Sequence, residues 1–306
     1  MPNRDLLDSK GDWFNNGCMK IAVSTYSLSR WRHDRSRSLE QTIDQIASMG
    51  VHGIEFSGID GGDRRSPTRR AEVLRRRCER VGLAVAGYCI GAELYGPPSR
   101  QRAAVVSVKR HVEIAEALGA RTMRHDVSGG PSPRSKRTTF SGVVANLVPA
   151  IRAIADHAAS RGVVTSLENH GFYMQKATRV EALIKKVDHP NFGLTLDMGN
   201  FLCVNDDPVA AVKRLAPYAV MVHVKDFHIR AKKTMPAHGW FATPTSIALR
   251  GAVLGHGAVD VAAQIRWLRR SRYRGWLSLE FEGIEDPIQA VGWGLDHLRS
   301  ILNRSH

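Results

Sequence analysis

The 306-residue sequence contains few cysteines and no long apolar segment. Its four cysteines, Cys18, Cys78, Cys89 and Cys203, are far apart and form no CxxC pair, which argues against a disulfide scaffold and against a zinc knuckle. We therefore expect reduced thiols in a protein core. The apolar runs are short and interrupted by charge, and none approaches the roughly 18 to 20 residues that cross a bilayer. The sequence thus predicts no membrane partner.

The N-terminal residues also lack the order of a secretory signal, in which positive residues precede an apolar segment. We therefore expect a cytoplasmic protein. Residues 1–18 show no strong hydrophobic period and are expected to form a loose leader. The remaining residues, 19–306, have the length of a single barrel domain, which is typically about 250 residues.

Basic residues exceed acidic ones, which gives a formal net charge of +15. Such an excess is one sign of an anionic partner, because a positive surface attracts phosphate backbones. The arginine-rich runs fall mostly on predicted helices, however, where solvated positive faces support solubility. We therefore expect no nucleic-acid partner.

Strand-like and helix-like segments alternate eight times from residue 19 onward, which indicates a parallel sheet covered by helices. The predicted strands are residues 20–24, 52–56, 83–88, 122–126, 163–168, 192–197, 219–224 and 276–281. Ser38 and Gln41 occupy the positions of a capping box, and Ser66-Pro67 is a second helix start. Eight units favour a single (β/α)8 TIM barrel with eight parallel strands and an outer ring of helices. An open doubly wound sheet is the alternative, disfavoured because no GxGxxG follows the first strand.

One connection, residues 226–259, is much longer than the others. Connections of this length are uncommon unless they serve as lids or binding segments. It follows the seventh strand and so leaves the C-terminal face of the barrel, where active sites are built.

Four consecutive predicted strands end in a potential metal ligand: Glu168, Asp197, His223 and Glu280. Because the C-terminal ends of neighbouring barrel strands converge, these side chains should surround one point. Three carboxylates at close range repel unless a cation balances them. Oxygen ligands with one imidazole suit Mn²⁺ best, with Mg²⁺ or Zn²⁺ as alternatives. For each acid taken singly, the competing interpretation is the N-cap of the next helix.

In these strand ends and their flanking motifs, the sequence resembles the xylose-isomerase-like barrel superfamily of sugar and sugar-phosphate isomerases and epimerases. The likeness spans roughly residues 19–302. The motifs that carry it are LENHG (167–171), LDMGN (196–200), HVKD (223–226), GHGAVD (255–260) and LSLEFEG (277–283).

The resemblance implies that Glu168, Asp197, His223 and Glu280 bind one divalent ion, and that Glu168 and Glu280 also form a proton-transfer pair. Physical chemistry agrees, since a cation that polarises a carbonyl acidifies the neighbouring C–H and stabilises the resulting enediolate. Two departures stand out. Asn200 occupies the position where many ketose epimerases have a histidine, and Lys225 and Arg230 only roughly match their arginine.

Five further residues are candidates for substrate binding. His170 lies two residues beyond Glu168, so strand alternation would return it to the same face. Lys225 could neutralise a phosphate or a developing oxyanion. The other candidates, each with a purely structural alternative, are His256 between two glycines and the strand-end residues His125 and Glu55.

We therefore expect a metal-dependent isomerase or epimerase that removes a proton next to the carbonyl of a keto-sugar or sugar phosphate. The alternative enzyme is a metal-dependent lyase or dehydratase acting on an oxidised sugar, an inositol or a glycoside, because it begins with the same step. Two other classes are an endonuclease acting at abasic DNA sites and a non-catalytic sugar-binding protein. The expected partner is a small carbohydrate, and a homo-oligomer is possible.

Overall fold

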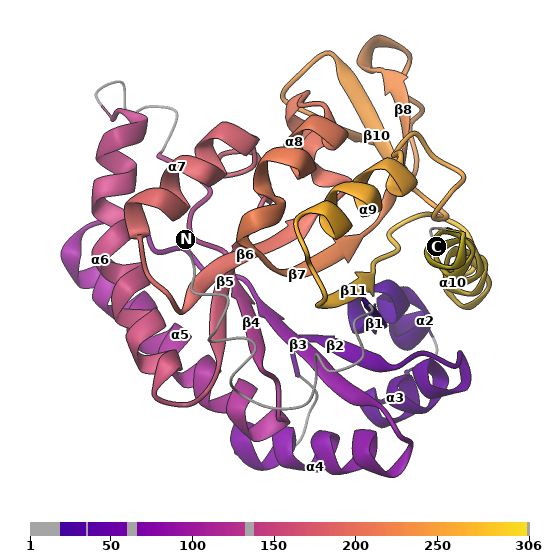
Figure 1. Ribbon diagram of the computed structural model, residues 1–306, viewed down its shortest axis with the longest axis horizontal. Helices are drawn as coiled ribbons and strands as arrows, with labels where there is room; N and C mark the ends of the chain where they lie inside the picture. The colour runs from indigo at the N-terminus through magenta and orange to yellow at the C-terminus, as the bar shows by residue number, and fades with distance from the viewer. Residues whose placement is uncertain (1–18, 35, 60–65, 132–137, 305–306) are drawn as a thin grey trace.

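The computed structural model describes residues 19–34, 36–59, 66–131 and 138–304, so the predicted leader and Cys18 lie outside the described residues. Eight parallel strands close into a barrel in the order β1, β2, β3, β4, β5, β6, β7, β11 (Figure 1). They are β1 (Lys20–Ser24), β2 (Gly53–Ser57), β3 (Ala84–Ile90), β4 (Thr122–His125), β5 (Val164–Glu168), β6 (Phe192–Asp197), β7 (Ala219–Val224) and β11 (Trp276–Leu279). The predicted (β/α)8 barrel is confirmed.

Helices cover the outside of the barrel (Figure 1). They are α2 (Ser29–Asp34), α3 (Leu39–Ser48), α4 (Pro67–Arg80), α5 (Pro98–Leu118), α6 (Phe140–Ala159), α7 (Ala177–Val187), α8 (Pro208–Leu215), α9 (Val261–Arg270) and α10 (Pro287–Asn303), with short 3-10 helices at Thr25–Leu28, Asn200–Val204, Ala216–Tyr218 and Lys232–Thr234. The predicted capping box is present, with Ser38 Oγ accepting from Gln41 N and Gln41 Oε1 accepting from Ser38 N. In the described part of the chain, no helix combines the length and the apolar character that a membrane span needs.

The eighth barrel strand ends two residues earlier than the sequence predicts, at Leu279. Glu280 N still donates a hydrogen bond to Val224 O of β7. The next amide, Phe281 N, donates to the Ser27 hydroxyl instead, so the chain leaves the sheet here. Glu280 therefore sits just beyond the strand, at the rim of the barrel.

The main hydrophobic core lies between the strands and the helices, and a small second cluster of Ala22, Ala86 and Met221 fills the barrel interior. Gly53 shows how tightly β2 packs, because a Cβ there would lie 2.8 Å from the Trp276 ring and 2.9 Å from Ala84 O. The three cysteines in the described residues, Cys78, Cys89 and Cys203, are buried and unpaired.

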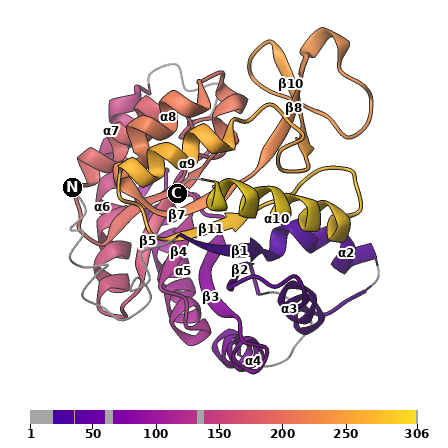
Figure 2. The same cartoon turned by 45° about the vertical axis from the view of Figure 1, so that its right-hand side comes forward.

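The long connection after β7 contains a three-stranded antiparallel sheet rather than an irregular lid. Its strands are β8 (Asp226–Ala231), β9 (Phe241–Ala242) and β10 (Ile247–Ala252), with β10 in the middle. In Figure 2, β8 and β10 rise beside the barrel, away from α4 and α5. The guanidinium groups of Arg230 and Arg250 lie 5.6 and 5.5 Å from the centroid of the Trp240 ring.

Candidate metal centre at the barrel mouth

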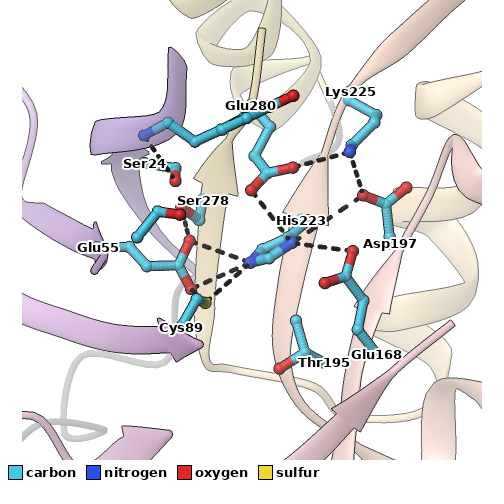
Figure 3. A network of polar contacts seen from close by, with 12 residues as sticks. Ser24, Glu55, Cys89, Glu168, Thr195, Asp197, His223, Lys225, Ser278 and Glu280 are labelled. Carbon is cyan, nitrogen blue, oxygen red and sulfur yellow. Dashed lines mark hydrogen bonds and ion pairs between the residues drawn. The ribbon is translucent and has the colours of Figure 1, made fainter. Parts of the chain in front are cut away.

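The four side chains predicted as metal ligands meet at one end of the barrel (Figure 3). Nδ1 of His223 lies 3.5 Å from Glu168 Oε1, 3.5 Å from Glu280 Oε1 and 4.0 Å from Asp197 Oδ2. Glu168 and Asp197 close β5 and β6, and Glu280 follows β11. The side chains thus converge on a single point, His223 Nδ1, from four neighbouring strands.

Strand alternation explains why these residues face inward. Two residues earlier on the same strands, Ser166 and Thr195 also point into the barrel and their hydroxyls are 2.8 Å apart. Asp197 and His223 are register partners on β6 and β7, which brings them to the same height. A polar layer therefore lies directly beneath the cluster.

The other imidazole nitrogen of His223 is held from the opposite side of the barrel. Nε2 lies 3.0 Å from the carboxylate of Glu55 on β2. Glu55 in turn accepts hydrogen bonds from Ser278 Oγ at 2.7 Å and from Cys89 Sγ at 3.2 Å. A carboxylate that accepts from Nε2–H fixes the ring orientation and leaves the Nδ1 lone pair available, which is the usual arrangement behind a metal-ligating histidine.

Among the described residues, the buried Nδ1 of His223 has no hydrogen-bond partner, and the buried Oδ2 of Asp197 is engaged through an ion pair with Lys225 Nζ at 3.1 Å. Candidate ligand atoms of Glu168, Asp197 and His223 all lie within 4.8 Å of one another. Unpartnered polar atoms in a protein interior are costly and need an explanation. A divalent cation held by Glu168, Asp197, His223 and Glu280 fits this donor set, which is mainly carboxylate with one imidazole.

Glu168 is held by donors at both carboxylate oxygens. Oε2 contacts the guanidinium of Arg124 on β4 through two nitrogens, and Oε1 accepts from Asn200 Nδ2 at 3.0 Å. Asn200 stands where the related epimerases are expected to have a histidine. Its amide therefore contacts a candidate metal ligand directly.

Asp197 is anchored through its backbone and through one oxygen. Oδ1 accepts from Gly199 N at 2.8 Å and from Asn200 N at 2.7 Å. The side chain of Asn169 pairs with the backbone N and O of Asp197, both at 2.9 Å. The remaining oxygen, Oδ2, is thus directed toward His223.

Lys225 is the cation that balances the other side of the cluster. Its Nζ lies 2.8 Å from Glu280 Oε2, 3.1 Å from Asp197 Oδ2 and 4.0 Å from Glu282 Oε1. Tyr26 extends this chain of contacts by donating to Glu282 Oε2 at 3.1 Å. Lys225 is therefore engaged by protein carboxylates, whereas the sequence predicted a role toward substrate.

The buried charges shift one another's pKa values. Burial raises the pKa of Asp197 from 3.8 to about 6, against the opposing effect of Lys225. Burial would also raise the pKa of Glu168, but Arg124 and His223 outweigh it and hold that pKa well below its usual range. For His223 burial favours the neutral form, yet Glu280 and Glu55 raise its pKa well above the usual value. The carboxylates around His223 therefore favour its positively charged form.

The remaining predicted site residues lie at different distances from the centre. His170 is half exposed at the rim, with Nδ1 3.4 Å from Asp126 Oδ1. His125 is buried outside the barrel beside Phe192, so β4 does not direct it toward the mouth. His256 stacks on Trp293, and its two glycine neighbours donate their amides to Asp226 Oδ2.

Arg124 and Cys89 were not predicted as site residues from the sequence, and no contact was predicted for the side chain of Asn200. Alternation along β4 was the available signal for Arg124, because Thr122 faces the interior and donates to Ala86 O. His125, the residue predicted on β4, lies on the outer face of the barrel, whereas its neighbour Arg124 lies on the inner face. The partners of these side chains come from other strands, so no local pattern indicated them.

A closed eight-stranded barrel with a carboxylate-rich candidate metal centre at its mouth defines the general class of this protein. The chain belongs to the xylose isomerase-like TIM barrel family, whose model matches residues 43–301. The resemblance inferred from the motifs is thereby confirmed.

Several relatives match most of the chain, among them the following two. The sequence is 29% identical over 293 residues to the rhizopine catabolism protein MocC of Rhizobium meliloti, covering 90% of this chain and 85% of that protein. It is 23% identical over 291 residues to an inosose dehydratase of Bacillus anthracis, covering 90% of this chain and 93% of that enzyme.

Solved structures show the same fold. The IOLI protein with a bound zinc atom superposes with a TM-score of 0.73 at 15% identity, covering 94% of this chain and 99% of that one. The 3-keto-D-glucoside 4-epimerase YcjR of E. coli superposes with a TM-score of 0.70 at 19% identity, covering 92% and 99%. At these identities the likeness establishes the barrel.

Proposed function

We propose that this protein is a divalent-metal-dependent isomerase or epimerase that removes and returns a proton next to the carbonyl group of a keto-sugar. The observation that carries this proposal is the buried Nδ1 of His223, which has no hydrogen-bond partner in the described part of the chain and which three carboxylates face at 3.5 to 4.0 Å. The four side chains Glu168, Asp197, His223 and Glu280 hold the ion. Mn²⁺ is the preferred ion for this donor set, with Mg²⁺ or Zn²⁺ as alternatives.

When bound, the cation polarises the substrate carbonyl and stabilises the negative charge that develops when the adjacent C–H loses its proton. Glu168 and Glu280 then form the proton-transfer pair, one carboxylate removing the proton and the other returning it. Their side chains differ in exposure, 2% for Glu168 and 10% for Glu280. Glu280 is therefore the carboxylate with the freer approach to substrate.

A dehydratase acting on a cyclic polyol ketone is the second candidate. The inosose dehydratase relative, which covers 90% of this chain, favours it. In this reaction Lys225, whose ammonium group lies 2.8 Å from Glu280, would hold that carboxylate in place. In that reaction a carboxylate takes the α-proton, the C–O bond at the β-carbon breaks, and the hydroxyl leaves as water.

The deciding experiment incubates the protein with manganese and a panel of keto-sugars and cyclic polyol ketones in deuterated water. An isomerase or epimerase places deuterium beside the carbonyl and leaves the composition of the substrate otherwise unchanged. A dehydratase releases a product that is one water lighter. A protein that binds manganese but exchanges no proton in any of these substrates is not an enolising enzyme of this kind.

The variant Glu168→Gln separates ligation from proton transfer, since the amide oxygen can still contact the ion. Retained manganese binding with lost exchange supports Glu168 as a proton-transfer group, whereas full exchange removes it from that role. Asp44→Asn is the matched control, because Asp44 pairs with Arg77 between α3 and α4, away from the mouth. This control should bind manganese and exchange protons as the wild type does.

A further inference from the structure

Arg124 lies on β4, and its side chain reaches the barrel mouth. It is the basic side chain that contacts Glu168 there. Its side chain is only 14% exposed. Nη1 donates to Ile90 O of β3 at 3.0 Å and lies 3.6 Å from Asp126 Oδ1. The guanidinium is therefore fixed to the barrel wall by contacts that do not involve Glu168.

The same guanidinium orients the carboxylate of Glu168. Nε and Nη2 of Arg124 both contact Oε2 of Glu168, on the side away from His223. The other oxygen, Oε1, accepts from Asn200 and lies 3.5 Å from His223 Nδ1. With Oε2 occupied by a planar two-nitrogen fork, the carboxylate cannot rotate, and Oε1 remains directed at the centre.

Glu280 lacks a restraint of this kind. Among the described residues, its carboxylate contacts Lys225 Nζ and His223 Nδ1, and lysine offers a point charge rather than a planar fork. The two glutamates of the centre are thus held differently, Glu168 by an anchored two-nitrogen fork and Glu280 by a single ammonium group.

We propose that Arg124 is a positioning residue that holds Glu168 as a fixed ligand and thereby sets the affinity of the centre for its cation. This inference rests on the metal centre of the proposed function. It opposes the simplest electrostatic expectation, in which a positive charge beside a cation site weakens binding and its removal strengthens it. The sign of the change in affinity therefore separates positioning from mere charge.

The test measures Mn²⁺ affinity by isothermal titration calorimetry for the wild type, Arg124→Met and Arg124→Lys. We expect Arg124→Met to bind Mn²⁺ about 10 to 100 times more weakly, the range typical of residues that orient metal ligands. Arg124→Lys keeps the charge but cannot reproduce the fork, so its affinity should lie between those of the wild type and Arg124→Met. It also serves if Arg124→Met does not fold. Equal or tighter binding by Arg124→Met, or wild-type binding by Arg124→Lys, overturns the proposal.

A double-mutant cycle with Glu168→Gln tests whether Arg124 acts through Glu168. If it does, adding Arg124→Met to Glu168→Gln should change the Mn²⁺ affinity no further, because the fork has lost its carboxylate. Additive losses would overturn the assignment. Arg77→Met is the matched control, since Arg77 makes a similar two-nitrogen contact with Asp44 outside the barrel. Absence of Mn²⁺ binding by the wild type would instead overturn the proposed metal centre itself.

Discussion

The two halves of the barrel contribute different kinds of side chain to the mouth. Glu168 and Asp197 end β5 and β6, His223 lies one residue before the end of β7, and Glu280 follows β11, so this half supplies the four candidate ligands. Strands β2, β3 and β4 contribute Glu55, Cys89 and Arg124. Glu55 and Cys89 contact His223 from across the barrel, and Arg124 contacts Glu168 from the neighbouring strand. The difference indicates a division of labour, in which one half supplies the ligand atoms and the other fixes their orientation. Substitutions in each half of the barrel test this division.

The largest effect should come from the ligand half. Asp197→Asn removes one negative charge and leaves an amide in a fully buried position. We expect Mn²⁺ affinity to fall by more than about a hundredfold, beyond the range seen for residues that only orient ligands. Calorimetric titration measures this, with Asp44→Asn as the control. A loss no greater than that of the partner-half variants would break the comparison.

A smaller loss is expected from the partner half. Glu55→Gln keeps an oxygen that can accept from His223 Nε2, but removes the charge that favours this hydrogen bond, and its amide protons face the Ser278 donor. The Mn²⁺ affinity should fall by about 10 to 100 times. The same titration measures it. Unchanged affinity would show that Glu55 has no part in orienting the histidine.

Acidic pH should weaken cation binding through the ligand half alone. The pKa of Asp197 is raised to about 6 and that of His223 lies above its usual value, so protons compete with the ion for both groups. Affinity should therefore rise with pH, by about tenfold per unit for each proton released, and more steeply below about pH 6. Titrations in buffers of different ionisation enthalpy count the protons. Affinity independent of pH between 5 and 7 would contradict this.

The smallest effect on Mn²⁺ affinity should come from a substitution of Asp226, the acidic residue that ends the HVKD motif (223–226). Asp226 accepts amide hydrogen bonds from Gly255, Gly257 and Val259, and a Cβ at Gly257 would lie 2.1 Å from its Oδ1. Asp226→Ala should lower the free energy of unfolding by about 1 to 3 kcal/mol and leave Mn²⁺ affinity within about threefold of the wild type. Chemical denaturation and titration measure the two. A large loss of affinity would place Asp226 in the metal centre.

Local patterns predicted much of this fold because they arise from interactions within one segment. Hydrophobic periodicity located the eight strands, and the Ser38 capping box located a helix start to the residue. The convergence of the four candidate ligands was predicted because a closed parallel barrel gathers strand ends at one rim, so position along each strand was enough. His125 shows the limit of this reasoning, since being last on a strand does not decide which face a side chain occupies.

The sequence by itself determined an eight-unit barrel and an acidic, histidine-containing rim, since both follow from periodicity and from where polar residues interrupt each apolar strand. Only the tertiary structure decided the partners: that Glu55 holds His223, that Arg124 holds Glu168, and that Lys225 lies between Asp197 and Glu280. Glu55 and His223 are 168 positions apart. Contacts across such separations depend on closure of the barrel and on side-chain direction, and neither leaves a trace in the neighbouring sequence.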